Sequence, residues 1–411
     1  MSKDITVPAD DRSSRLVLRT KGILPVQKLK LLAAKGAISA PAGYEIEDDQ
    51  FQPNSIDLRL GEVAYRVRCS FLPENESVES KLKKLTQHSF SLKDGAVLEP
   101  NCTYIIPLLE SLDLPQSIVD YQKNLFSQNG SSPDFCVVSD QQLSARTNPK
   151  SSTGRLDIFT RVITDHSHRF EEIVAGYKGN LYLEVVPKTF SIRARTGQRL
   201  NQLRIRHGNA VLDDQDILHV HQTDPLLFNA AGVPLATDDL KVSSGLFMSV
   251  SLQGNEDNII GYKARKNRDL IDMEKVNFYK TREFWEPIYA NQEDYLILEP
   301  EAFYIFASRE RCRIPRHLAA EMVPYDTGSG ELRTHYAGFF DSGFGGSRED
   351  AGARAVLEVR SHDVPFLIED GQTFFRMVFE PNTEVPDFVY GEDIKSNYQG
   401  QALKLSKHFK P

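Results

Sequence analysis

The chain has 411 residues, of which 40% are apolar and 26% charged, and its formal net charge is −8. This length is enough for two domains of ordinary size, each with its own apolar core. An acidic chain is a poor candidate for extended duplex binding, which depends on clustered Lys and Arg, although a local basic pocket for one triphosphate remains possible. No apolar run reaches the roughly 18 to 20 residues of a membrane helix. We therefore expect neither a nucleic-acid partner nor a membrane partner.

The first residues, MSKDITVPADDRSS, are polar and acidic and do not resemble a signal peptide. The cysteines lie far apart and form no CxxC pair; they are Cys69, Cys102, Cys136 and Cys312. This spacing favours reduced thiols over a disulfide framework. Together these features predict a cytoplasmic protein.

In chain order, the clearest predicted helix covers residues 26–38, VQKLKLLAAKGAI, which has a glycine near its end, and a second is expected over roughly residues 266–280. Residues 121–150 are polar and rich in Ser, Gln and Asn, and we interpret the segment as a surface loop or flap. Most other segments are short, β-branched or aromatic, and bounded by turn residues: TYIIPLL, NLYLEVVP, YLILEP, AFYIFAS, ARAVLEVR and TFFRMVFEP. Such segments are typical of all-β sandwiches and barrels. The last residues, SNYQGQALKLSKHFKP, have no strong periodicity and are interpreted as a tail.

The sequence contains an internal repeat. LEPNCTYIIPLLESLDLP at 98–115 matches LEPEAFYIFASRERCRIP at 298–315, with a constant offset of 200 residues. Farther on, LEVV at 183–186 matches LEVR at 357–360, with an offset of 174 because the first copy carries an insertion. Such long-period similarity indicates duplication of one domain.

The densest cluster of polar functional groups is Lys150-Ser151-Ser152-Thr153-Gly154-Arg155. Two adjacent hydroxyls and the backbone amides near a glycine could bind an anion, and the guanidinium of Arg155 offers a rigid set of donors. Taken alone, the segment could equally be an ordinary Ser/Gly-rich turn with a basic neighbour.

Glu184 lies in a segment of strand character, Gly179-Asn180-Leu181-Tyr182-Leu183-Glu184-Val185-Val186. Alternation puts Leu181, Leu183 and Val185 on one face and Tyr182, Glu184 and Val186 on the other. Partial desolvation would raise the pKa of such a carboxyl and make it a general base near neutrality. An edge-strand glutamate facing water is the alternative.

Zinc-dependent base deaminases need a His-x-Glu and a Cys-x-x-Cys ligand set. Neither occurs in this sequence, and the two His-x-His pairs, at 166–168 and 219–221, lack an obvious third ligand. Phosphate-loop, dinucleotide-binding and nucleophile-elbow signatures are also missing. The sequence therefore predicts no zinc site.

Four ordered segments resemble the signatures of the dCTP deaminases of the dUTPase-like superfamily. They are QPNSIDLRLG at 52–61, SSTGRL at 151–156, AGYKGNLYLE at 175–184, and NYQGQ at 397–401 followed by Ser406-Lys407. The resemblance spans nearly the whole chain and implies two tandem dUTPase-like β-barrel or β-clip domains, mainly β with a few short helices. We expect residues 1–207 to carry the active-site motifs and residues 208–411 to form the second domain with a closing tail.

The resemblance implies hydrolytic deamination of dCTP to dUTP and ammonia, feeding dUMP and dTTP synthesis. Glu184 would activate water without zinc, Arg155 would orient Glu184, and Ser151 would hold the water or base. The implied substrate-binding residues are Lys150, Ser152, Tyr177, Tyr398, Gln399 and Gln401. Mg²⁺ would enter with the triphosphate, and a trimer-based homo-oligomer is expected, because the family's sites lie between subunits.

The sequence departs from the family pattern in the phosphate-binding residues and in the second copy. Asn397 stands where Lys is usual, and Lys150 where Arg is common. In the second copy, Glu358 aligns with Glu184, but Thr327-Gly328 and Glu331 replace the hydroxyl pair and Arg155. We therefore expect that copy to be catalytically silent.

Two other functions stay open. One is a dUTP pyrophosphatase or a bifunctional enzyme, for which Phe340-Asp341-Ser342-Gly343 in the second copy offers a closer pattern than the first copy does. The other is a non-catalytic deoxynucleotide-binding regulator.

Overall fold

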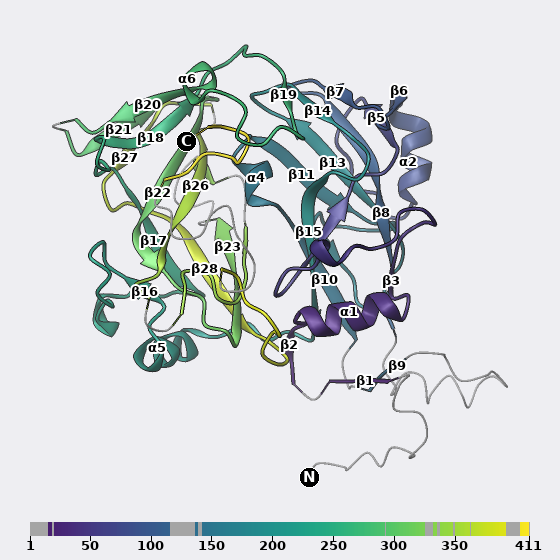
Figure 1. Cartoon of the computed structure of the whole chain (residues 1–411), viewed down its shortest axis with the longest axis horizontal. Helices are drawn as coiled ribbons and strands as arrows, with labels where there is room; N and C mark the ends of the chain where they lie inside the picture. Colours follow the sequence, from purple (N-terminus) through teal and green to yellow (C-terminus); the bar gives the residue numbers. More distant parts are fainter. Residues whose placement is uncertain are drawn as a thin grey trace, which may run out of the picture.

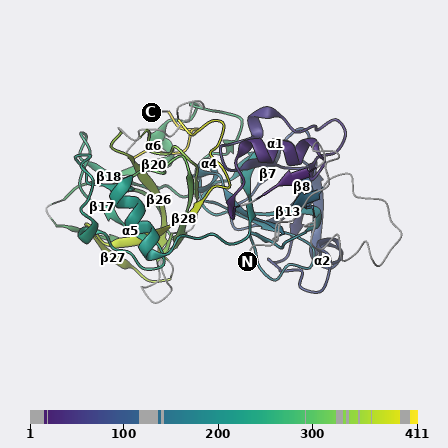
Figure 2. The same cartoon turned by 90° about the horizontal axis from the view of Figure 1, so that it is seen from below.

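Two β-rich halves of the chain lie side by side, purple to teal and green to yellow (Figures 1 and 2). The computed structural model describes residues 15–18, 20–115, 136–138, 142–291, 293–324, 332–334, 338–347, 350–361, 363–391 and 403–410. No helix in these ranges is long and apolar enough to cross a membrane.

The first half is built around two sheets. One contains β2 (Gly22–Ile23), β4 (Ile56–Arg59), β10 (Leu143–Pro149), β12 (Glu172–Ile173) and β15 (Arg199–His207). The other contains β3 (Ile38–Ser39), β5 (Val63–Val67), β6 (Thr86–Ser91), β8 (Thr103–Asp113), β11 (Ile158–Ile163) and β13 (Lys178–Pro187). β1 (Arg15–Val17) pairs with β9 (Cys136–Val138). The helices of this half are α1 (Val26–Ala34), α2 (Val78–Leu85), α4 (Ser151–Gly154) and the 3₁₀ turn η2 (Asp48–Gln50).

The second half contains one large sheet. Its strands are β16 (Leu227–Phe228), β17 (Leu246–Ser251), β18 (Ile259–Ala264), β20 (Trp285–Tyr289), β22 (Phe303–Cys312), β23 (Leu318–Pro324), β24 (Leu332–Thr334), β25 (Phe339–Phe340), β26 (Ala353–Ser361) and β28 (Thr373–Pro381). β21 (Tyr295–Leu298) pairs with β27 (Phe366–Glu369). A third sheet, β7 (Ala96–Leu98), β14 (Ile192–Ala194) and β19 (Ile271–Asp272), joins the halves. The helices are α5 (Asp214–Thr223), α6 (Thr281–Phe284) and the 3₁₀ turn η3 (Thr237–Asp239).

The repeat is visible in the strand register. β13, β8 and β5 lie next to one another in the first half, and β26, β22 and β18 do so in the second. Glu184 is paired with Ile105, and Glu358 is paired with Ile305. The duplicated tyrosines also make the same turn contact, because Tyr104 Oη accepts a hydrogen bond from the Glu99 amide at 3.0 Å and Tyr304 Oη accepts one from the Glu299 amide at 2.9 Å. These shared contacts support the duplication inferred from the sequence.

The boundary between the halves is packed with both apolar and polar groups. The core of the first half continues into Trp285, Phe303 and Ile305 of the second. The buried side chains of Arg204 and Asp341 form an ion pair across the boundary at 2.8 Å. Such contacts fix one half against the other, which matters because functional groups lie at this boundary.

The mainly-β prediction is confirmed, and each of the six short segments named from the sequence contains a strand. The first helix ends at Ala34, before Gly36, whose φ of +77° does not continue a helix. The helix predicted over 266–280 is wrong. This segment instead contains β19, and the amide of Asp272 donates to Tyr279 Oη at 2.6 Å. In the predicted flap at 121–150, residues 116–135 and 139–141 lie outside the described ranges, while Leu143–Pro149 forms β10.

Candidate active site

The Ser-Ser-x-x-Arg segment forms a single helical turn at the boundary between the halves. α4 (Ser151–Gly154) lies between β11 and β26 in Figure 1. The turn is anchored on β15, because the Lys150 amide and Thr153 Oγ1 both donate to the Leu200 carbonyl, at 3.0 and 2.9 Å. Ser152 and Arg155 are buried, whereas Ser151 is exposed. The turn therefore presents the Ser151 hydroxyl outward and sends Arg155 into the boundary.

Arg155 lies beside Glu358 of the second half. Its Nε is 4.0 Å from Glu358 Oε1, and the two side chains are only 8% and 7% exposed. The Arg155 Nη1 group also donates to the Lys404 carbonyl at 2.9 Å. The second copy has no arginine at the position equivalent to Arg155. Its glutamate, Glu358, therefore lies beside the arginine of the first copy.

Burial raises the pKa of Glu358 to about 8, although the nearby Arg155 charge acts to lower it. Desolvation disfavours the ionised carboxylate, and at this site it outweighs the attraction of the guanidinium. A carboxyl that titrates this close to neutrality can both accept and return a proton, as general acid–base catalysis requires.

Glu184 is held differently, and the prediction that Arg155 orients it is wrong. Glu184 Oε1 accepts hydrogen bonds from Arg161 Nε at 3.0 Å and from Arg161 Nη2 at 2.5 Å. The two residues are cross-strand partners on β11 and β13, so this contact is set within the first half. The alternation predicted around Glu184 is confirmed, because Leu181, Leu183 and Val185 are part of the apolar core.

An ion pair across the boundary fixes Glu358 relative to α4. Asp157, two residues beyond Arg155, is fully buried and pairs with Arg360, two residues beyond Glu358. Thr189 Oγ1 contacts both partners, donating to Asp157 and lying 3.1 Å from Arg360 Nη2. Because Glu358 and Arg360 lie on the same face of β26, this contact limits how far Glu358 can shift from Arg155.

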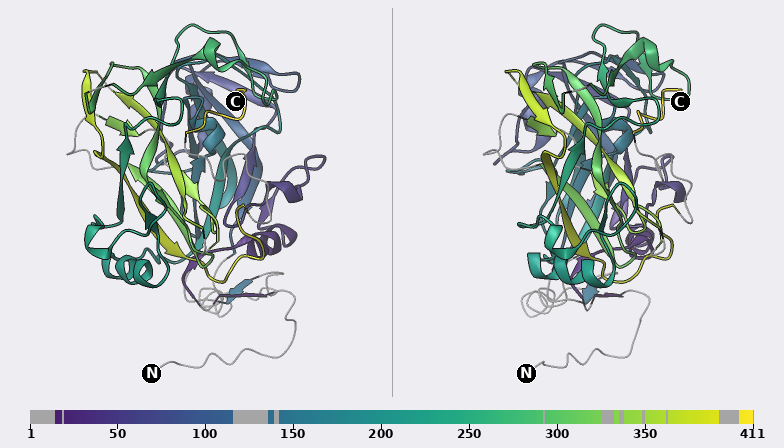
Figure 3. Two further views of the ribbon diagram at one scale, coloured as in Figure 1. Left: turned by 60° about the vertical axis from the view of Figure 1, so that its left-hand side comes forward. Right: turned by 90° about the vertical axis from the view of Figure 1, so that its left-hand side faces the viewer.

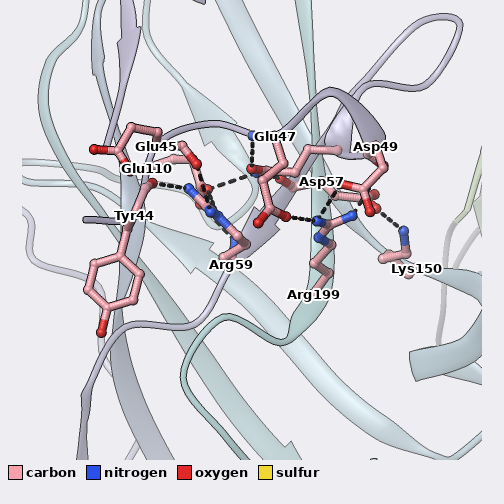
Figure 4. A network of polar contacts seen from close by, with 10 residues as sticks. Tyr44, Glu45, Glu47, Asp49, Asp57, Arg59, Glu110, Lys150 and Arg199 are labelled. Atoms are coloured by element: carbon pink, nitrogen blue, oxygen red, sulfur yellow. Dashed lines mark hydrogen bonds and ion pairs between the residues drawn. The ribbon is translucent and has the colours of Figure 1, made fainter. Parts of the chain in front are cut away.

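Lys150 pairs with the buried Asp57 of β4, from the first family-like segment. Figure 4 shows this pair beside two further carboxylate–guanidinium groups. In one, Arg199 Nη2 lies 2.7 Å from both Glu47 and Asp49; in the other, Arg59 Nε lies 2.7 Å from Glu110. The pair with Asp57 holds the Lys150 ammonium close to the start of α4.

The described part of the tail, residues 403–410, lies against α4. Ser406 Oγ is 2.9 Å from the Ser152 carbonyl and 2.9 Å from His408 Nδ1, and His408 Nε2 is 3.2 Å from the Met273 carbonyl. Phe409 packs on Phe284 and Trp285. Both views of Figure 3 mark the C-terminus, where the yellow end of the chain stops. The tail thus covers the turn that carries Ser152.

The remaining predicted binding residues have different outcomes. Tyr177 is buried in the first core and its hydroxyl donates to the Asn180 carbonyl at 2.7 Å. Within the described residues this hydroxyl is used to hold the turn before β13, and a role of Tyr177 in substrate binding stays a prediction. Tyr398, Gln399 and Gln401, like Thr327, Gly328 and Glu331 of the second copy, lie outside the described residues. Among the described residues, no group of three or more His, Cys, Asp or Glu side chains is arranged to hold a metal ion.

Sequence reasoning did not identify Glu358, Asp157 or Arg360 as parts of this site. The repeat aligned Glu358 with Glu184, but an alignment within one chain does not say which copy's arginine faces which glutamate. For Asp157, the one indication in the sequence was that this acidic residue directly follows the SSTGRL segment.

Both halves of the chain resemble known proteins. Residues 20–132 and 136–209 match the family model "2'-deoxycytidine 5'-triphosphate deaminase (DCD) N-terminal domain", and residues 213–409 match the corresponding C-terminal domain. A crystal structure of 2'-deoxycytidine 5'-triphosphate deaminase from Agrobacterium tumefaciens is 43% identical, with a TM-score of 0.77, and the match covers 89% of this chain and 100% of that one. No curated protein sequence matched the chain. The predicted pair of dUTPase-like domains is thereby confirmed, and the chain belongs to the 2'-deoxycytidine 5'-triphosphate deaminase family.

Proposed function

We propose that the chain deaminates dCTP to dUTP and ammonia at the boundary between its two domains, with Glu358 as the general base. The observation that carries this proposal is the pairing of Glu358 from the second domain with Arg155 from the first, both buried and 4.0 Å apart. Family membership supports the reaction, and the geometry supports this choice of glutamate over Glu184.

In the proposed reaction, the Glu358 carboxylate takes a proton from a water molecule as the water oxygen bonds to C4 of cytosine. The C4–N bond then breaks, and the protonated carboxyl returns a proton to the departing amino group, which leaves as ammonia. Arg155 stabilises the ionised form of Glu358 by its charge, and the exposed Ser151 hydroxyl can position the water or the base. Because a carboxylate activates the water, this mechanism needs no zinc.

The phosphates would bind on the first-domain side of the boundary. Lys150 and Ser152 are the candidates, since both belong to the α4 segment and the tail packs on the same turn. Mg²⁺ would arrive as the counter-ion of the triphosphate and is part of the substrate in this proposal. A site shared between subunits in the family would here be shared between two domains of one chain. Assembly into a trimer-based oligomer stays a prediction, which light scattering during size-exclusion chromatography would measure.

The test is to incubate purified protein with dCTP and Mg²⁺, follow ammonia release, and separate the nucleotides. Appearance of dUTP with an equal amount of ammonia is expected. Formation of dUMP and pyrophosphate would instead support the bifunctional alternative, although Asp341, the acidic residue of that pattern, is already paired with Arg204. Binding of dCTP without either product would contradict the proposal and favour a regulator.

A further inference from the structure

A cavity of about 700 Å³ lies at the boundary, on the Glu184 side. Its wall includes Phe159 and Arg161 of β11, Glu184 of β13, residues 266–268, and Arg360 of β26. Pockets for small ligands fall in the range of about 300–1,000 Å³. The cavity is therefore large enough for a nucleotide.

The carboxylate of Glu184 has one oxygen left for a ligand. Glu184 is fully buried, and Arg161 occupies its Oε1. Its Oε2 is buried with no hydrogen-bond partner among the described residues. A buried acceptor without a donor is costly, and a ligand N–H group entering the cavity would remove that cost.

The cavity also has cations that are not used by carboxylates. Lys188, Lys266 and Arg268 line it and form no ion pair with any described residue, whereas Arg161 and Arg360 are paired. Five basic side chains line the cavity against three acidic ones, in a chain whose net charge is −8. This local excess of positive charge suits a ligand that carries several negative charges.

We propose that this cavity is a second nucleotide site, which binds a nucleoside polyphosphate without deaminating it. Its phosphates would lie against Lys188, Lys266 and Arg268, and an N–H or amino group of its base would donate to Glu184 Oε2. Turnover is not expected there, because Arg155, which the reaction is proposed to need, lies beside Glu358, and Ser151 belongs to the same turn, α4.

A ligand at this site would act on the proposed catalytic glutamate through β26. Arg360 lines the cavity and pairs with Asp157, and Glu358 lies two residues before it on the same strand face. Charge placed beside Arg360 competes with Asp157 for the guanidinium and so affects the contact that fixes Glu358. This regulatory role rests on the proposed function, whereas the binding site does not.

The experiment is calorimetric titration of dUTP and Mg²⁺ into the full-length Glu358→Gln variant, with dUTP chosen because its base carries an N–H donor. Two nucleotides per chain are expected. Adding Lys266→Ala and Arg268→Ala should leave one, while the charge-matched control Lys35→Ala and Lys83→Ala, at exposed positions, should leave two. Adding Arg155→Ala instead should remove the other site.

A stoichiometry of one that Lys266→Ala and Arg268→Ala do not change would overturn the second site. Binding of two nucleotides that is insensitive to this pair would overturn it too. Neither result depends on turnover, so failure of the proposed function would show separately, as absence of ammonia from the wild-type chain given dCTP.

Discussion

Replacing each of the two repeated glutamates by glutamine should separate their roles. Glu358→Gln removes a group that can accept a proton and keeps nearly the same volume. Loss of a positioned general base lowers turnover by about 10²–10⁴-fold, equivalent to roughly 3–5 kcal/mol of activation free energy. In the wild type, kcat/KM should rise with pH up to about 8, where Glu358 titrates.

The same substitution should stabilise the fold. Burial raises the pKa of Glu358 from an ordinary value of 4.5 to about 8, so the folded protein keeps a proton that the unfolded chain releases. The wild type therefore loses stability as pH rises from about 4.5 to 8, and at pH 7 this cost is on the order of 3 kcal/mol. Glu358→Gln does not titrate, so its stability advantage should grow over that pH range and level off above it.

Glu184→Gln should behave in the opposite way. It removes the charge that faces Arg161 but keeps an acceptor oxygen, and Arg161 retains its hydrogen bond to Ser70 Oγ at 2.7 Å. We expect a loss of about 1–3 kcal/mol in unfolding free energy, with turnover per folded molecule retained. Ammonia release and thermal unfolding, measured from pH 5 to 9 on both variants, distinguish the general base from the glutamate that only stabilises the fold. If Glu184→Gln abolishes turnover and Glu358→Gln does not, the base is Glu184 and the reasoning from the Arg155 contact is refuted.

Three further outcomes follow from contacts around the site. Asparagine at position 157 tolerates the left-handed φ of +57° of Asp157, so Asp157→Asn removes only the charge that faces Arg360. In steady-state kinetics, kcat should fall about tenfold with little change in KM. An unchanged kcat would contradict the positioning role of Asp157. Phe409→Ala removes a ring from the aromatic cluster that anchors the tail, so limited proteolysis should cut the tail faster and KM for dCTP should rise, whereas equal cutting rates would contradict the anchoring role. Burial lowers the pKa of His408 to about 4. Docking of the tail should therefore weaken as pH falls from about 6.5 toward 4, because protonated His408 favours the undocked tail. His408→Gln should make the rate of proteolytic cutting independent of pH in that range.

The sequence carried much of the architecture. Short alternating segments between turn residues predicted the strands, because the period of two is a local property that burial of one sheet face imposes. The repeat predicted the duplication, and the structure shows it in the register that pairs Glu184 with Ile105 and Glu358 with Ile305. The helix predicted over 266–280 did not form, because only Ile271 and Tyr279 of its apolar residues are buried. Val276 and Phe278 are exposed, so the apolar residues do not share one helix face.

Residue chemistry was likewise available from the sequence: a hydroxyl pair, an arginine, and a glutamate in each copy. Which glutamate faces the arginine was decided only by the tertiary structure. Arg155 is 29 positions from Glu184 in the sequence, but the arginine that contacts Glu184 is Arg161, because Arg161 lies directly opposite Glu184 on the neighbouring strand. Glu358 meets Arg155 because the two domains pack face to face, with Asp157 and Arg360 paired beside them. Sequence periodicity encodes which face of a strand is buried, whereas contacts between domains depend on how two finished surfaces fit together.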